Sequence, residues 1–197
     1  MSIAKINYRD LIQEAIKGHS AKYIEIRIEE TLSTHLSYRG RDLEEAGHNS
    51  GIGGCVRALT GGGWGFVCFN SLIGLRDKVS TAVTNSKFVK GKEIKLAPVE
   101  PAVDIVSTTL LKDPTEVSLV DKKALLDQYI DIIWHTPRIA SSNLRYGDGR
   151  RRVVFCNSEG TYTDQEKVDV VFGASAMARK DGDIQQSNLS IGSSGDF

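Results

Sequence analysis

One glycine-rich stretch has the sequence Gly51-Ile52-Gly53-Gly54-Cys55-Val56-Arg57-Ala58-Leu59-Thr60-Gly61-Gly62-Gly63-Trp64-Gly65-Phe66-Val67-Cys68-Phe69. Glycine supplies the positive φ angles that tight hairpin turns require. We therefore predict a β-hairpin whose turn is Gly61-Gly62. In that register Leu59 lies opposite Trp64, Arg57 opposite Phe66, and Cys55 opposite Cys68.

The elements around this hairpin follow from the spacing of apolar residues. Isoleucine alternates with charge over Tyr23–Glu29, which predicts a strand with one buried face. Thr34–Arg39 follows closely enough to be a second strand paired with the first. Two helices are predicted from helical spacing, at Asn7–Lys17 with Gly18 as its cap, and at Leu72–Lys87 with Ile73, Leu75, Val79, Ala82 and Val83 on one side.

The second half of the chain begins after three prolines, Pro98, Pro101 and Pro114, which favour an extended linker. Ser118 is the expected cap of a helix that runs to about Trp134, with an apolar stripe on one side. The remaining sequence predicts strands at Asn143–Tyr146, Arg152–Cys156, Thr161–Asp164 and Val168–Arg179, followed by a short strand through Ile184. Turns are predicted at Asn157–Gly160 and Asp181–Asp183. The end of the chain, Ser190–Phe197, has a flexible composition.

These elements predict an α+β fold with two small units of mostly antiparallel sheet flanked by helices. We expect an amino-terminal domain at residues 1–92, a Pro-containing linker at 93–117, and a central helix plus antiparallel β region at 118–191. Each sheet should leave an exposed edge. Such an edge can bind an extended peptide, or it can be covered by a partner chain or a missing domain.

Composition excludes several classes of protein. The chain of 197 residues has 25 Lys+Arg and 25 Asp+Glu, so its zero net charge argues against a nucleic-acid partner. No apolar run is long enough to cross a bilayer, and we expect no membrane partner. The polar start Met1–Asn7 does not resemble a signal peptide, which makes a cytoplasmic location the expectation.

A search for catalytic chemistry finds no convincing constellation, so we predict no catalytic residue and no metal ligand and assign no substrate-binding residue. His19, His35, His48 and His135 do not have metal-ligand spacing. His35 could approach Glu29 or Glu30 across a hairpin, although a surface pair is favoured. Cys55 and Cys68 could bind metal or form a disulfide, although two packed thiols are favoured. The remaining candidates are assigned to turns: the glycines of Gly51-x-Gly53 and Gly61-x-Gly63, and a solvated turn at Arg150-Arg151-Arg152.

Several ordered motifs resemble the TldD/PmbA proteins, also called modulators of DNA gyrase. They are Tyr23–Arg27, Gly51–Arg57 and Gly62–Phe66 in the first half, followed by Leu96–Val99, Asp113–Leu119, Asn157–Gly160 and Ala176–Arg179. The resemblance extends from about Tyr23 to the end of the chain.

The resemblance implies a cytoplasmic zinc-dependent peptidase that acts on peptides or unfolded segments as a dimer enclosing its active site. The zinc motif of that family belongs to a carboxy-terminal domain, and no such motif occurs in this sequence. We therefore expect a truncated chain with no cofactor of its own, inactive alone, that supplies substrate enclosure and subunit contacts and forms a homo- or heterodimer with a family member. The alternative is a non-catalytic regulatory or peptide-binding module that pairs with a complete family member.

Overall fold

The computed structural model describes residues 7–197. The start of the chain at residues 1–6, on which the signal-peptide argument rests, lies outside the described residues. The elements of the described part are α1 (Tyr8–Ile16), β1 (Tyr23–Arg39), β2 (Asp42–Thr60), β3 (Gly63–Phe69), α2 (Leu75–Phe88), β4 (Val103–Val106), a 3-10 turn (Pro114–Glu116), α3 (Leu119–His135), β5 (Ile139–Asn157), β6 (Tyr162–Lys180) and β7 (Asp183–Ser193).

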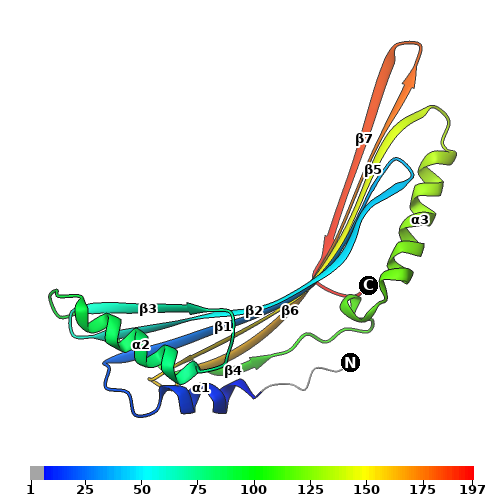
Figure 1. The fold of residues 1–197 in the computed structure, drawn as a ribbon. Helices are drawn as coiled ribbons and strands as arrows, with labels where there is room; N and C mark the ends of the chain where they lie inside the picture. Colours follow the sequence, from blue (N-terminus) through cyan, green and yellow to red (C-terminus); the bar gives the residue numbers. More distant parts are fainter. Residues whose placement is uncertain (1–6) are drawn as a thin grey trace. The chain divides into compact units, whose positions relative to one another are not determined.

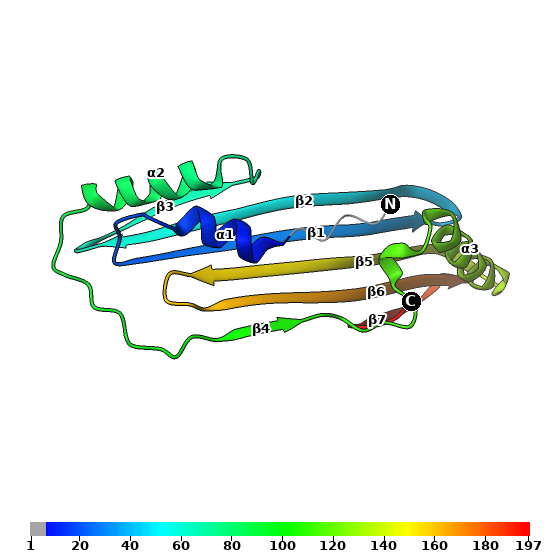
Figure 2. The same ribbon diagram turned by 90° about the horizontal axis from the view of Figure 1, so that it is seen from below.

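The strands form one sheet in the order β3-β2-β1-β5-β6-β4, and β7 pairs with another part of β6 (Figures 1 and 2). Pairing is antiparallel between β2 and β3 and between β6 and β7, whereas β4 pairs with β6 in parallel. The predicted α+β class with a mostly antiparallel sheet is confirmed.

The chain divides into two compact units, and each unit combines three separate stretches of sequence. Within the described residues, unit 1 comprises residues 7–30, Gly51–Ser107 and Arg152–Glu166, and unit 2 comprises Thr31–Ser50, Thr108–Arg151 and Lys167–Phe197. Strands β1, β2, β5 and β6 therefore contribute residues to both units. The predicted division into residues 1–92, a linker at 93–117 and residues 118–191 stays a prediction.

The β2–β3 hairpin has the register that the glycine-rich stretch predicts. Leu59 pairs with Trp64, Arg57 with Phe66 and Cys55 with Cys68. Gly61 in the turn has a φ of +55°, a conformation that side-chain-bearing residues rarely adopt. Gly51 and Gly53 lie within β2 instead, so the expectation that they serve a turn is wrong.

Gly65 in β3 allows α2 to pack directly on the strand. A Cβ atom at Gly65 would lie 2.5 Å from the backbone nitrogen of Ser86 and closer still to the carbonyl oxygen of Ala82. Both atoms belong to the α2 backbone, which cannot move aside as a flexible side chain can. The glycine at this position therefore sets the distance between helix and strand.

The core of unit 1 lies between its strands and the helices α1 and α2, which cover the same face (Figures 1 and 2). Ile24, Ile26 and Ile28 are buried on this face, as the alternation in Tyr23–Glu29 predicts. Asn7 caps α1 by accepting a hydrogen bond from the backbone of Asp10. The prediction for α2 is confirmed except at Ile73, which precedes the helix and is 87% exposed.

The strands are longer than predicted. Thr34–Arg39 is not a separate strand paired with Tyr23–Glu29, because both belong to β1 and the chain reverses only afterwards, at Gly40. Burial at alternate positions resumes at Thr34 and continues at Leu36 and Tyr38, as it does for one continuous strand.

The region after residue 89 also differs from expectation. The predicted linker contains a short strand, β4, and the final strand is not short, because β7 extends to Ser193. The flexible end predicted at Ser190–Phe197 is wrong for its first residues, and the Phe197 ring packs against the buried side chains of unit 2. The predicted turns at Asn157–Gly160 and Asp181–Asp183 are confirmed, with positive φ at Gly160, Asp181 and Gly182.

Unit 2 packs α3 against β1, β5 and β6. The buried cluster contains Leu36 and Tyr38 from β1, Leu126 and Ile130 from α3, and Leu144 and Tyr146 from β5. Ser118 caps α3 as predicted, since its hydroxyl accepts from the Asp121 backbone nitrogen at 3.1 Å and donates to the Asp121 carboxylate at 2.7 Å. Across residues 7–197, the helices are too short or too polar to cross a membrane.

Candidate functional site: an apolar groove beside helix α3

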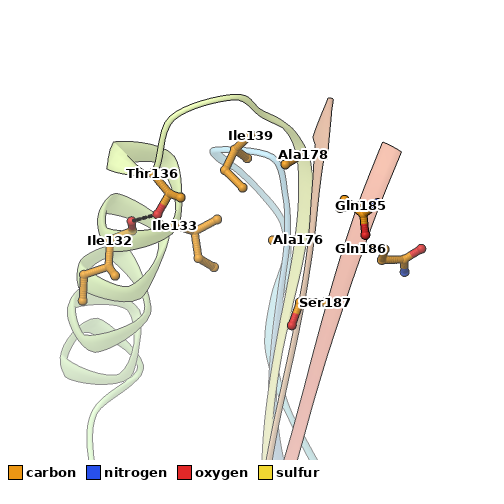
Figure 3. Close-up of a pocket in the computed structure, with 9 residues that line it drawn as sticks. All are labelled: Ile132, Ile133, Thr136, Ile139, Ala176, Ala178, Gln185, Gln186 and Ser187. Carbon is orange, nitrogen blue, oxygen red and sulfur yellow. Dashed lines mark hydrogen bonds between the residues drawn. The ribbon is translucent and has the colours of Figure 1, made fainter. Parts of the chain in front are cut away.

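A groove of about 360 Å³ lies in unit 2 between the end of α3, the start of β5, the end of β6 and the start of β7. Ile133 of α3 and Ile139 of β5 extend into the space between the helix and the strands (Figure 3). Ala176 and Ala178 lie on β6, where their small side chains leave room. The lining residues are Ile132, Ile133, Thr136, Ile139, Ala176, Ala178, Gln185, Gln186 and Ser187.

The groove has the chemistry of a binding surface. The described residues that line it carry aliphatic, hydroxyl or amide side chains, and none of those carries a carboxylate, an imidazole or a thiol. The Thr136 hydroxyl donates to the Ile132 carbonyl at 3.3 Å and is therefore already used within α3. Such a surface can accept apolar side chains, and the amides of Gln185 and Gln186 can hydrogen-bond to a peptide backbone.

Strand β7 borders the groove and is exposed along its whole length. Within the described residues β7 pairs with β6 alone, so its other edge carries backbone groups that a further strand can bind. Leu189 and Ile191 are 52% and 55% exposed, and Asp183 is the only charged residue of the strand. Lysine and proline, which protect many edge strands, are absent from β7.

A buried ion pair fixes α3, and thereby one wall of the groove, to the sheet. The Lys122 ammonium lies 2.5 Å from the Asp148 carboxylate of β5, and both side chains are 0% exposed. Lys122 also donates to the Thr34 hydroxyl of β1 at 3.0 Å and lies 5.8 Å from the centre of the Tyr146 ring. The pattern of apolar residues in α3 gives no indication of this buried lysine.

Two further polar contacts tie α3 to the strands. The Tyr38 hydroxyl donates to Asp127 at 2.6 Å, and burial together with this carboxylate raises the pKa of Tyr38 to about 12. The Trp134 indole donates to the Ser142 hydroxyl at 2.9 Å. Burial is also the main cause of the raised pKa of Tyr146, with Asp148 as the second cause.

The arginine run lies in the interior of β5, so the prediction of a solvated turn at Arg150-Arg151-Arg152 is wrong. Arg152 forms two hydrogen bonds to Asp164, at 2.9 and 2.7 Å, and Arg150 pairs with Asp113. The Arg152 side chain is only 14% exposed. The carboxylate of Asp164 compensates the charge of the Arg152 guanidinium, which explains how the interior of a strand accommodates this arginine.

The histidines do not come together. His35 lies in the same strand as Glu29 and Glu30, so an approach across a hairpin is excluded by the continuity of β1. Its ring packs on Gly47 of β2, where an added Cβ would lie 2.9 Å from the imidazole. Glu30 instead accepts a hydrogen bond from the Tyr8 hydroxyl at 2.6 Å.

The zinc implied by the resemblance does not fit the residues present. Over residues 7–197 there is no group of three or more His, Cys, Asp or Glu side chains that could hold a metal ion. The predictions that name no catalytic residue and no metal ligand stay predictions. The groove residues were not assigned from the sequence, although Ala176 and Ala178 belong to one of the motifs that carry the resemblance.

Comparison with known proteins identifies the family. A family model described as PmbA/TldA metallopeptidase domain 1 matches residues 24–86, and the model of the PmbA/TldA metallopeptidase central domain matches residues 112–197. The chain therefore belongs to the PmbA/TldD family of metallopeptidases, as the resemblance predicts.

Individual relatives agree with this assignment. A metalloprotease of Synechocystis sp. is 34% identical over 88% of this chain and 38% of the relative. A crystal structure of a protein described as a modulator of a DNA gyrase, from Thermotoga maritima, has a TM-score of 0.77 at 14% identity and covers 95% of this chain and 44% of that one. The structure of TldE from Thermococcus kodakarensis has a TM-score of 0.67 at 16% identity, covering 94% and 42%. The chain thus spans less than half the length of each of these relatives.

Proposed function

We propose that this chain forms the amino-terminal and central part of a zinc metallopeptidase that acts on peptides or unfolded segments. Its part is to enclose the substrate and to make subunit contacts, whereas the zinc chemistry belongs to a further domain. Family membership supports the peptidase class, and the match to the first and central domain models supports this division of labour.

The groove of unit 2 is the observation that carries the substrate-binding proposal. It combines an apolar lining with an adjacent strand, β7, whose outer edge is unpaired within the described residues. An extended peptide beside β7 would bind through its backbone, and one of its apolar side chains would enter the groove. Backbone recognition does not depend on the peptide's sequence, which suits a peptidase that acts on unfolded segments.

Peptide binding tests this proposal directly. We expect a fluorescently labelled apolar peptide in extended conformation to bind the chain saturably in an anisotropy titration. Ala178→Glu places a charge in the groove and should raise the Kd at least about tenfold, equivalent to about 1.4 kcal/mol. Asn188→Asp adds the same charge on β7 at an exposed residue that is not among those lining the groove, and should change the Kd less than about twofold.

Each outcome of this titration decides the proposal. Circular dichroism of both variants establishes that the fold is retained. Absence of saturable binding by the unsubstituted chain contradicts the proposal, and so does equal weakening by the two variants.

The proposal includes a dimer, either of identical chains or with another family member, in a cytoplasmic location. Exposed apolar residues on β7 support subunit contacts, because such surfaces promote association. Sedimentation of the chain over a range of concentrations tests this point. A strictly monomeric profile at the highest concentration contradicts it.

A second candidate is a non-catalytic regulatory or peptide-binding module that pairs with a complete family member. It is favoured by the lack of a metal-holding group within residues 7–197. The two candidates differ in how the chain is connected to a zinc-binding domain. In the first, the chain and the zinc-binding domain belong to one enzyme, whereas in the second the chain pairs non-covalently with a complete family member. A neutral net charge fits either one better than a nucleic-acid partner, and weak, salt-insensitive retention on DNA is the expected result.

A further inference from the structure

Two cysteines lie directly opposite each other in the β2–β3 hairpin. Cys55 and Cys68 are register partners on antiparallel strands, and both are free thiols. We propose that Cys55 and Cys68 are a redox modification site that closes to a disulfide when it meets a small-molecule disulfide such as oxidised glutathione. This inference is independent of the proposed peptidase role.

The backbone geometry of the pair matches that of a disulfide. Residues directly opposite on antiparallel strands have Cα atoms about 4.5–5.5 Å apart, and disulfides span Cα separations of about 4.4–6.8 Å. Cys68 lies near enough to Cys55 to contribute to the raised pKa of the Cys55 thiol, which donates a hydrogen bond to the Val56 carbonyl at 3.5 Å. Bond formation therefore needs side-chain rotation and no change in strand register.

Exposure distinguishes the roles of the two thiols. Cys68 is exposed and Cys55 is half-buried, so an external reagent meets Cys68 first. Burial raises the pKa of Cys55, which keeps that thiol protonated and makes it the second to react.

The third cysteine cannot compete. Cys156 is 3% exposed and belongs to the buried cluster on the face of the sheet that α1 and α2 cover. Val56, the neighbour of Cys55 in β2, is part of the same cluster, so Cys55 itself points to the opposite face of the sheet. The pairing of Cys55 with Cys68 is thereby selective.

The reaction is two thiol–disulfide exchanges. The Cys68 thiolate attacks one sulfur of oxidised glutathione, so that a protein–glutathione bond forms and one glutathione thiolate leaves. Cys55 then loses its proton to solvent and its sulfur attacks that of Cys68, releasing the second glutathione. Two protein thiols are oxidised and one molecule of oxidised glutathione is reduced to two thiols, which balances atoms and electrons.

The bond would lock the outermost strand on one side of the sheet. β3 is the terminal strand of the order and pairs with β2. The Cys55–Cys68 bond joins the two strands near the end remote from the turn, closing residues 56–67 into a loop. We expect slower amide hydrogen exchange at Val67 and Phe69 in the oxidised chain, because opening of the strand end is then prevented.

Intact mass and thiol titration test the proposal. The full chain is incubated with excess oxidised glutathione, and we expect two of its three thiols to be lost, with a mass decrease of two hydrogen atoms and a peptide map that links Cys55 to Cys68. Cys55→Ser should stop at a glutathione adduct on Cys68. Cys68→Ser should keep its remaining thiols, and Cys156→Ala should close as the unsubstituted chain does.

Three results would overturn the proposal. They are a stable glutathione adduct on Cys68 of the unsubstituted chain, a link from either cysteine to another molecule or to Cys156, and retention of all three thiols. Because the peptide map is made on the unsubstituted chain, the test does not depend on the folding of any variant.

Discussion

Substitution of Lys122 by methionine should destabilise unit 2 strongly. Methionine keeps an apolar stem of similar length but removes the ammonium that lies 2.5 Å from Asp148, and both side chains are 0% exposed. The Asp148 carboxylate would then be buried without its cation. Breaking a buried pair from one side costs about 3–5 kcal/mol, which is a large share of the stability of a typical domain.

Lys123 provides the matched control, because it neighbours Lys122 on α3 and also pairs with an aspartate. The Lys123–Asp127 pair spans 2.6 Å, but its side chains are 44% and 45% exposed, and such pairs within a helix contribute only about 0.3–0.5 kcal/mol. The assay is urea denaturation followed by circular dichroism. Lys122→Met should lower the midpoint by about 1–2.5 M, given a slope of about 2–3 kcal/mol/M, whereas Lys123→Met should barely move it.

The double variant Lys122→Met with Asp148→Asn separates two explanations. If the cost of Lys122→Met arises from an uncompensated carboxylate, neutralising Asp148 restores a substantial part of the stability. Equal midpoints for Lys122→Met and Lys123→Met would show that the buried Lys122–Asp148 pair contributes no more to stability than the exposed Lys123–Asp127 pair. A double variant that is no more stable than Lys122→Met alone would show that the uncompensated carboxylate is not the cause of the loss.

Three further predictions concern unit 1. Gly65→Ala should lower the free energy of unfolding by about 1–3 kcal/mol, because the added methyl group forces α2 away from β3. Gly173→Ala is the control and should be nearly neutral, because its methyl group would make only ordinary contacts. Equal denaturation midpoints for the two variants would contradict this prediction. Arg152→Met should lower the free energy of unfolding by about 2–3 kcal/mol, because it removes two hydrogen bonds to Asp164. Arg152→Lys keeps the charge but not the paired geometry and should recover only part of that stability. Full recovery by lysine would show that the charge alone matters. Burial raises the pKa of Tyr23 to about 12 from the usual value near 10. The protonated tyrosine therefore contributes its full stabilisation below pH 10, and this contribution is lost as the pH rises through 12. Tyr23→Phe should flatten the alkaline decline of the urea midpoint, and an unchanged decline would contradict a raised pKa at Tyr23.

Local rules predicted the parts of the fold that depend on neighbouring residues. The Gly61-Gly62 turn determined the register of the hairpin, because a two-residue turn leaves only one pairing of the flanking strands. The helix cap at Ser118 follows from side chains within three residues of the helix start. Alternation in Tyr23–Glu29 identified the buried face correctly for the same reason.

Contacts between distant residues explain the parts that were not predicted. Gly147-Asp148-Gly149 has the composition of a turn, yet it lies within β5 because Asp148 pairs with Lys122 of α3. The groove could not be assigned either, since its lining comes from one helix and three strands. Ala176 and Ala178 stood out from the sequence as part of the Ala176–Arg179 motif, which gave no indication of a groove.

The division of labour between this chain and a zinc-binding domain is tested most directly by one paired measurement on the purified 197-residue chain: its zinc content and its hydrolysis of an unfolded peptide. We expect substoichiometric zinc and no hydrolysis above background, because residues 7–197 contain no group of side chains that could hold the metal. One zinc ion per chain together with hydrolysis that a chelator abolishes would contradict it.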